Sequence, residues 1–175
     1  MFEKYSYTNT YQYLKKHYDA MTRCTDGAPV KNFILPAPDG KMVSLEDFRG
    51  KWVLLDFWYV DCPWCRKLTP NLGKIYPEYK NKGLEIISIS VDNVKDRDRM
   101  LKVIADEKMV WTQVNDTTKK VVPDYFGVTG YPTIYLIDPQ GRGQAMKVGY
   151  CEAAGLRSFL DKYINYSASI KSQDH

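Results

Sequence analysis

The sequence predicts an α/β fold, and three observations support this prediction. Residues 52–58 form an apolar, β-branched and aromatic run of strand length, which breaks at Asp61 and is followed by Pro63. Proline suits the first turn of a helix, so the run is read as a strand, a tight turn and a helix. A second strand-like run at 84–91 is followed by helical spacing over 94–107. Apolar strands that alternate with helices are typical of a sheet covered on both faces.

The other expected elements complete this pattern. We expect a hairpin from 33–35 and 41–43 around the turn 36–40, a helical turn at 44–48, a helix from 62 to 80, a short strand at 111–114, a helical stretch from 118 to 126, a second hairpin from 133–137 and 144–148, and a closing helix over 152–164. Pro70 lies inside the second of these helices and should kink it.

The chain is expected to contain one domain with an extension at each end. Residues 1–27 form an N-terminal helical extension and linker, 28–165 form the domain, and 166–175 form a polar tail that should fray. The extension carries an apolar stripe at helical spacing, made of Tyr7, Tyr11, Leu14, Tyr18 and Met21. We favour packing of this stripe on the domain's own surface; an oligomer contact or a missing upstream domain are the alternatives.

Composition excludes several classes of function. The 175 residues carry a net charge of +4, with basic and acidic residues interleaved, so nucleic acid is not expected as a partner. No apolar run reaches membrane-spanning length. The N-terminal residues 1–5 lack the apolar core of a signal peptide, so either the protein is cytosolic or its export segment lies outside this sequence.

The cysteines are too few for a disulfide-built scaffold. Cys62 and Cys65 form a Cys-x-x-Cys pair, whereas Cys24 and Cys151 are isolated in the sequence. The pair could be half of a structural metal site, but the two histidines lie in the terminal segments, at His17 and His175. A position at the start of a helix, directly after a buried strand, favours a redox pair instead, and we expect no metal.

Cys62 is the candidate nucleophile. Unpaired N–H groups and the positive end of a helix dipole favour an anion at the position of the first sulfur. A thiol in such a place can have a pKa of roughly 3.5–7.5, against about 8.5 for an ordinary cysteine. We therefore expect Cys62 to be the exposed, attacking thiol and Cys65 to be the buried, resolving thiol.

These motifs resemble the thioredoxin superfamily. The resemblance rests on Asp56-Phe57-Trp58, Cys62-Pro63-Trp64-Cys65, Pro70, Gly130-Tyr131-Pro132-Thr133 and Val148-Gly149-Tyr150. Cys62 and Pro132 are far apart in the sequence, and in this the chain resembles the TlpA/ResA-like branch of the AhpC/TSA group. Members of that branch act outside the bacterial cytoplasmic membrane. The resemblance covers about residues 28–165. It implies a thioredoxin-like fold, a central mixed sheet flanked by helices, with an N-terminal β-hairpin and a central αβ insertion.

The resemblance also implies roles for individual residues. Asp56 matches the buried carboxylate of thioredoxins, so burial should raise its pKa and let it exchange a proton with Cys65. Pro132 matches the cis-proline that faces the disulfide, and the backbone of Tyr131 would pair with an extended substrate. Pro63 and Trp64, inside the motif, are expected to touch substrate, whereas Trp58 is expected in the core. An edge position for Asp56 and a trans Pro132 are the alternatives.

The resulting functional expectation is a thiol–disulfide oxidoreductase that reduces or exchanges protein disulfides through a mixed disulfide. Its partners would be protein thiols and disulfides and an upstream redox protein. It would need no cofactor beyond the Cys62–Cys65 pair, and it would act in the periplasm or another extracytoplasmic space. The alternatives are a peroxiredoxin-like thiol peroxidase, although no threonine lies three residues before Cys62, and a non-catalytic client-binding module.

Two positions depart from the family pattern. Many TlpA/ResA-like proteins have a glutamate three residues after the second cysteine, where this chain has Leu68. Asp61 stands directly before Cys62, and a nearby negative charge opposes formation of a thiolate.

Overall fold

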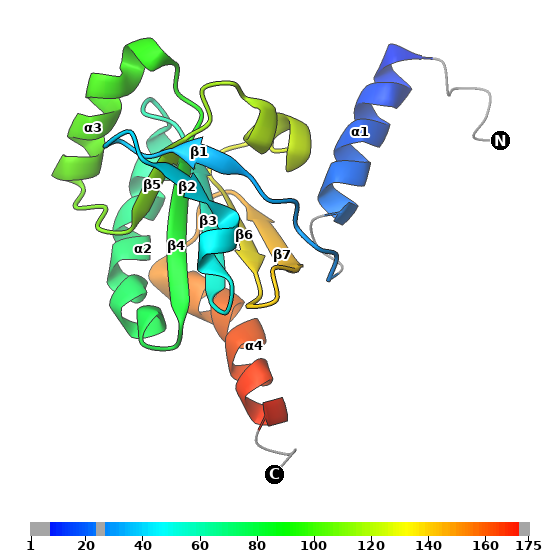
Figure 1. Ribbon diagram of the computed structural model, residues 1–175, viewed down its shortest axis with the longest axis vertical. Helices are drawn as coiled ribbons and strands as arrows, with labels where there is room; N and C mark the ends of the chain where they lie inside the picture. The colour runs from blue at the N-terminus through cyan, green and yellow to red at the C-terminus, as the bar shows by residue number, and fades with distance from the viewer. Residues whose placement is uncertain (1–7, 24–26, 172–175) are drawn as a thin grey trace.

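A five-stranded mixed sheet forms the centre of the structure, a computed structural model that describes residues 8–23 and 27–171 (Figure 1). The strands lie in the order β5 (Thr112–Asn115), β4 (Leu84–Ser90), β3 (Trp52–Trp58), β6 (Thr133–Ile137) and β7 (Gly143–Val148). Strands β3, β4 and β5 are parallel, whereas β6 and β7 are antiparallel to their neighbours. The predicted α/β fold with a mixed sheet is confirmed.

Four α-helices and a small second sheet complete the part of the fold that the structure describes. The helices are α1 (Asn9–Arg23), α2 (Pro63–Lys80), α3 (Arg97–Asp106) and α4 (Ala153–Lys171). Strands β1 (Ile34–Pro36) and β2 (Met42–Ser44) form the antiparallel N-terminal hairpin that the sequence predicts. A 3-10 helix at Leu45–Phe48 and a π-helical segment at Lys120–Tyr125 lie where short helical stretches are expected.

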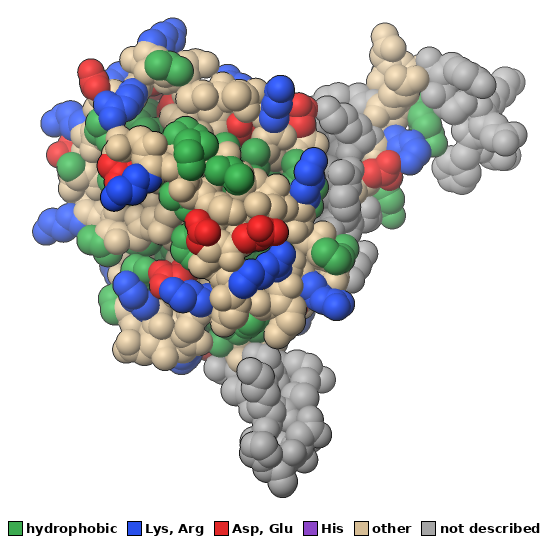
Figure 2. All heavy atoms as spheres, in the orientation of Figure 1, with side chains coloured by type: hydrophobic (Ala, Val, Ile, Leu, Met, Phe, Trp, Pro, Cys, Tyr) green, Lys and Arg blue, Asp and Glu red, His purple; other side chains and the backbone are tan. Residues whose placement is uncertain are grey.

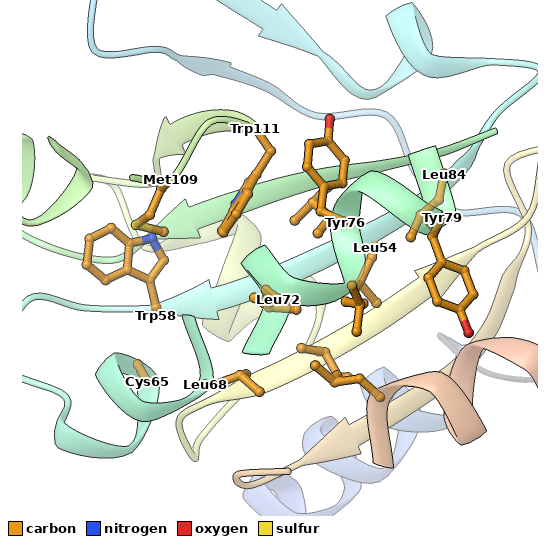
Figure 3. Close-up of a cluster of buried hydrophobic side chains, with 14 of the residues drawn as sticks. Leu54, Trp58, Cys65, Leu68, Leu72, Tyr76, Tyr79, Leu84, Met109 and Trp111 are labelled. Atoms are coloured by element: carbon orange, nitrogen blue, oxygen red, sulfur yellow. The ribbon is translucent and has the colours of Figure 1, made fainter. Parts of the chain in front are cut away.

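Each face of the sheet carries its own apolar core, because successive side chains of a strand point to opposite faces. Leu54 and Trp58 of β3 pack in the cluster that includes Leu68 and Leu72 of α2. Figure 3 shows these four side chains grouped between β3 and the helix. Phe57 belongs instead to the cluster on the opposite face. The strand is buried along its whole length, so its continuous apolar run is explained.

The predicted central insertion is α3 followed by β5, which pairs with β4 and adds an edge strand. Met100 and Val103 of α3, together with Trp111 just before β5, extend the same apolar cluster that α2 covers. The insertion therefore shares the core beneath the Cys-x-x-Cys helix. It is a continuation of the domain and not a separate layer.

Two residues of the N-terminal stripe are not covered by the domain as expected. Leu14 and Tyr18 of α1 are 60% and 69% exposed, and Figure 1 shows this helix beside the body of the domain. Tyr7 and the side chain of Met21 lie outside the part of the chain that the structure describes. An amphipathic pattern specifies that one face is suited to burial, but it does not specify what covers that face. The oligomer contact and the missing upstream domain remain predictions.

The closing helix extends beyond its predicted end at residue 164 and reaches Lys171. Residues 165–171 contain neither glycine nor proline, so nothing in the local sequence stops the helix. None of the described helices is both long enough and apolar enough to cross a bilayer. Basic and acidic side chains are mixed over the face that Figure 2 shows, as the sequence predicts.

Candidate active site

The cysteine pair stands at the junction of β3 and α2. Cys62 caps the helix with extended backbone angles, φ −84° and ψ 102°, and Pro63 is the first helical residue. The backbone N–H of Cys65 donates to Cys62 Sγ across 3.1 Å. The sulfur therefore occupies the position in which a capping oxygen accepts from an unpaired helix N–H. In the reduced protein the same N–H would stabilise a Cys62 thiolate.

The two sulfurs form a disulfide, so the structure represents the oxidised protein. Both cysteines are only 2% exposed, which differs from the expected contrast between an exposed Cys62 and a buried Cys65. Order along the helix does not set exposure here, because both residues belong to the apolar cluster beneath α2, with Tyr59 and Tyr131 packed against it. The accessibility of Cys62 after reduction stays a prediction.

Asp56 lies in the middle of β3, where it is 2% exposed. Its register partners are Ser88 on β4 and Ile134 on β6. Ser88 Oγ donates to Asp56 Oδ2 across 2.7 Å, and Trp111 Nε1 donates to Ser88 Oγ across 2.8 Å. Burial raises the pKa of Asp56 to about 6, and the Ser88 hydrogen bond partly opposes this rise.

This environment suits Asp56 for proton exchange near neutral pH. Asp56 lies two residues from both Leu54 and Trp58, so its side chain points to the same face of the sheet as theirs, the face that α2 covers. Cys65 belongs to the cluster on that same face. The expected burial of Asp56 and the expected rise of its pKa are both found, and the alternative of an exposed edge position is excluded.

The segment before β6 contains the cis-proline that the resemblance implies. The Tyr131–Pro132 peptide bond is cis. The Tyr131 ring meets Tyr59 edge to face, with 5.3 Å between ring centroids. Burial is the main cause that raises the pKa of Tyr131 to about 12, so its hydroxyl stays neutral at physiological pH. Pro132 is buried, while Tyr131 is half-buried and borders the apolar cluster.

Trp64 is 53% exposed, as expected for a residue that touches substrate, and Pro63 beside it is also exposed. The Trp64 ring centroid lies 5.9 Å from that of Tyr150, and Lys67 Nζ lies 4.3 Å from the Trp64 centroid. Trp58, in contrast, is 1% exposed and belongs to the core. The two tryptophans near the motif therefore have the different positions that the sequence predicts.

The negative charge of Asp61 is offset by a partner on another element. Asp61 forms an ion pair with Arg99 of α3, which also lies 3.4 Å from Asp96. The expected opposition of Asp61 to a Cys62 thiolate is therefore weakened. Leu68, three residues after Cys65, is 1% exposed and fills the core beneath the motif.

Sequence reasoning missed a second buried carboxylate, Asp92. It accepts hydrogen bonds from the backbone N–H of Val60 at 3.0 and 3.2 Å and from Ser90 Oγ at 2.6 Å. Asp92 thus holds the turn that leads from β3 to Cys62. Burial raises the pKa of its carboxyl. The available signal was an aspartate directly after the apolar run 84–91, whereas Asp56 stood out as a carboxylate inside an apolar run.

Of the two isolated cysteines, the structure describes Cys151, which belongs to the same apolar cluster as Cys62 and Cys65. Cys151 is a buried free thiol whose backbone carbonyl accepts from Asn71 Nδ2 at 3.3 Å. Burial raises the pKa of the Cys151 thiol, although Lys147 partly opposes this effect. Cys24 lies outside the described residues. Within the described residues, no three histidine, cysteine, aspartate or glutamate side chains are placed to hold a metal ion.

A disulfide at the start of a helix and a buried carboxylate on the same face of this mixed sheet are the features of a thioredoxin-like thiol–disulfide oxidoreductase. Comparison with known proteins gives the family: the AhpC/TSA family profile matches residues 27–145, and the chain belongs to that family.

The similar proteins agree with this class. The chain is 32% identical to the thiol-disulfide oxidoreductase ResA of Bacillus thuringiensis over 78% of its length and 77% of the relative. It is 31% identical to ResA of Bacillus subtilis, over 78% of this chain and 75% of that one. Among solved structures, a thioredoxin domain from Bacteroides vulgatus has 34% identity and a TM-score of 0.69, covering 79% of this chain and 96% of that one. A putative thiol:disulfide interchange protein DsbE from Chlorobium tepidum has 29% identity and a TM-score of 0.72, over 80% and 99% of the chains.

Proposed function

We propose that the protein reduces disulfide bonds in other proteins by using the Cys62–Cys65 pair as its electron donor. The observation that carries this proposal is the cysteine pair at the helix start with Asp56 buried on the same face of the sheet. The electrons come from the two thiols themselves, so the proposal includes no bound cofactor.

The reaction begins with the reduced pair. The Cys62 thiolate attacks one sulfur of a client disulfide, so that a Cys62–client disulfide forms and the other client sulfur leaves as a thiolate. Cys65 then loses its proton to the Asp56 carboxylate. The Cys65 thiolate attacks Cys62 Sγ, which closes the Cys62–Cys65 disulfide and releases the second client sulfur. One client disulfide is reduced, and one dithiol of the protein is oxidised.

Asp56 fits the role of base because its pKa of about 6 leaves it ionised near neutral pH while keeping it a better proton acceptor than an ordinary aspartate. The resolving step needs that acceptor because Cys65 is enclosed by apolar side chains. An upstream dithiol protein would return the pair to its reduced state by the reverse exchange. Resemblance to TlpA/ResA-like proteins supports a site of action outside the cytoplasmic membrane, which cell fractionation would test.

Reduction of insulin by dithiothreitol tests the function. We expect the protein to accelerate precipitation of the insulin B chain, and Cys62→Ser to abolish the acceleration. A wild-type protein that binds insulin without accelerating its reduction would instead support a client-binding module. Peroxide turnover with a recycling reductant, in the absence of disulfide reduction, would support the thiol peroxidase alternative.

A further inference from the structure

An exposed aromatic pair forms one side of the rim around the disulfide. Trp64 and Tyr150 are 53% and 38% exposed, and their rings lie 5.9 Å apart at 44°. Exposed aromatic rings next to a reactive group are the residues that most often anchor a protein partner. We call Trp64, Tyr150 and Lys67 the aromatic rim.

The aromatic rim is fixed by two connections to the rest of the site. Asn71 of α2, which is 8% exposed, donates to Tyr150 Oη and to the carbonyl of Cys151, each across 3.3 Å. The backbone N–H of Gly149 donates to the carbonyl of Pro132 across 2.8 Å, with Gly149 at φ +92°. Tyr150 is therefore held against both the motif helix and the proline segment. Such a surface loses little freedom when a client binds, which favours recognition.

The aromatic rim carries positive charge. Lys67 lies three residues after Trp64 on α2, so both side chains share one face of the helix, and Lys67 Nζ lies 4.3 Å from the Trp64 ring centroid. Lys147 lies near enough to Cys151 to lower the pKa of that thiol. Within residues 8–23 and 27–171, none of the ion pairs includes either lysine. The segment 147–152, which carries Lys147 and Tyr150, also contains one acidic residue, Glu152.

Two other charged residues beside the motif are already paired. Arg66 pairs with Glu107, and Asp61 pairs with Arg99. Lys67, whose Nζ lies over the Trp64 ring, belongs to none of the ion pairs of the described residues. A cation held over an exposed indole offers a client an apolar contact and a positive charge at the same place.

We propose that the aromatic rim selects clients with an acidic residue close to the reactive cysteine. This inference rests on the proposed disulfide reduction and names the chemistry of its client. The client segment places its cysteine at Cys62, an apolar side chain against Trp64 and Tyr150, and a carboxylate near Lys67. Charge complementarity of this kind sets specificity and the rate of encounter more than total affinity.

Three matched peptides test the proposal in a single turnover. Each carries one cysteine in a disulfide with thionitrobenzoate and differs only in having Glu, Gln or Lys two residues from that cysteine. When Cys62 attacks the peptide sulfur, coloured thionitrobenzoate is released, and Cys65 then frees the peptide thiol. We expect the second-order rate constant for release of thionitrobenzoate to be about two- to fivefold higher for the Glu peptide than for the Lys peptide, the range of an exposed ion pair. Added salt should reduce that ratio.

Lys67→Glu should reverse the order of the Glu and Lys peptides. This variant could also slow every peptide, because loss of a nearby cation disfavours the Cys62 thiolate. The ratio between peptides separates the two effects, since a change in thiolate content scales all three rates equally. Lys74→Glu, an exposed residue farther along α2, is the matched control and should keep the wild-type ratio.

Each outcome decides the proposal. Equal rates for the three peptides, or an unchanged ratio in Lys67→Glu, would overturn the selection of acidic clients while leaving disulfide reduction intact. A reversed ratio in Lys74→Glu would show that total charge acts instead of the aromatic rim. If none of the peptides is reduced by the wild-type protein, the proposed function itself fails.

Discussion

Replacement of Asp56 by asparagine tests the buried carboxylate in depth. Burial raises the pKa of Asp56 from the ordinary 3.8 to about 6, so folding favours the protonated form. Below the pKa that Asp56 has in the unfolded chain, Asp56 is protonated in both the folded and the unfolded state, and the folded state keeps its full stability. As pH rises from about 4 to about 6, the unfolded chain ionises first, and the free energy of unfolding falls. The rise in the pKa of Asp56 corresponds to a loss of ~3 kcal/mol in the free energy of unfolding, and this loss is complete above the pKa of Asp56 in the folded protein.

Asparagine cannot ionise, so Asp56→Asn should escape this loss. We expect the difference in the free energy of unfolding between variant and wild type to increase by ~3 kcal/mol between about pH 4 and about pH 8. Chemical denaturation of the oxidised proteins across this range measures the difference, and the other titrating groups cancel in it. Asp98→Asn is the matched control, because the side chain of Asp98 is 99% exposed. If the difference in the free energy of unfolding between Asp56→Asn and wild type does not change with pH, the raised pKa assigned to Asp56 is refuted.

The same variant should lengthen the life of a Cys62–client adduct at neutral pH. Loss of a positioned base slows a proton transfer by about 10²–10⁴-fold. Rapid acid quench followed by mass spectrometry measures the adduct. An unchanged lifetime would mean that Cys65 gives its proton to water and that Asp56 does not take part.

Three further predictions concern neighbouring residues. Ser88→Ala should raise the pKa of Asp56 further, because the Ser88 hydrogen bond lowers it. The pH range over which the free energy of unfolding falls should then extend to higher pH, and an unchanged range would contradict this. Alkylation of the reduced protein at about pH 6 should label Cys62 before Cys65, since only Cys62 caps the helix, and peptide mapping would expose the opposite order. Combined Cys24→Ser and Cys151→Ser should leave disulfide reductase activity within a few-fold; a collapse like that of Cys62→Ser would reveal a third catalytic thiol.

The central elements were predictable because their sequence signals are local. Strand β3 has the predicted bounds 52–58, since an unbroken apolar run suits a strand buried on both faces. Cys62 and Pro63 mark the start of α2 by capping preference and by the fixed φ of proline. Asp56 stood out as a carboxylate in an apolar strand, which requires explanation wherever it occurs.

The contacts that complete the site were not predictable in this way. Ser88 is one polar residue among several in β4, and its pairing with Asp56 depends on the register of two strands. Tyr150 reaches Asn71 across 79 positions of sequence. The burial of Cys62 in the oxidised protein also depends on tertiary packing. Long-range contacts of this kind follow from the fold and leave no periodic pattern in the sequence.

The division of labour between the two cysteines is the central claim, and trapping the mixed disulfide tests it most directly. Reduced Cys65→Ser and Cys62→Ser proteins are each mixed with a disulfide-containing client, and the adducts are identified by intact mass and peptide mapping. The account predicts that Cys65→Ser accumulates an adduct through Cys62, because the resolving thiol is missing, while Cys62→Ser forms none. An adduct through Cys65 in the Cys62→Ser protein, formed as fast as the first, would contradict it.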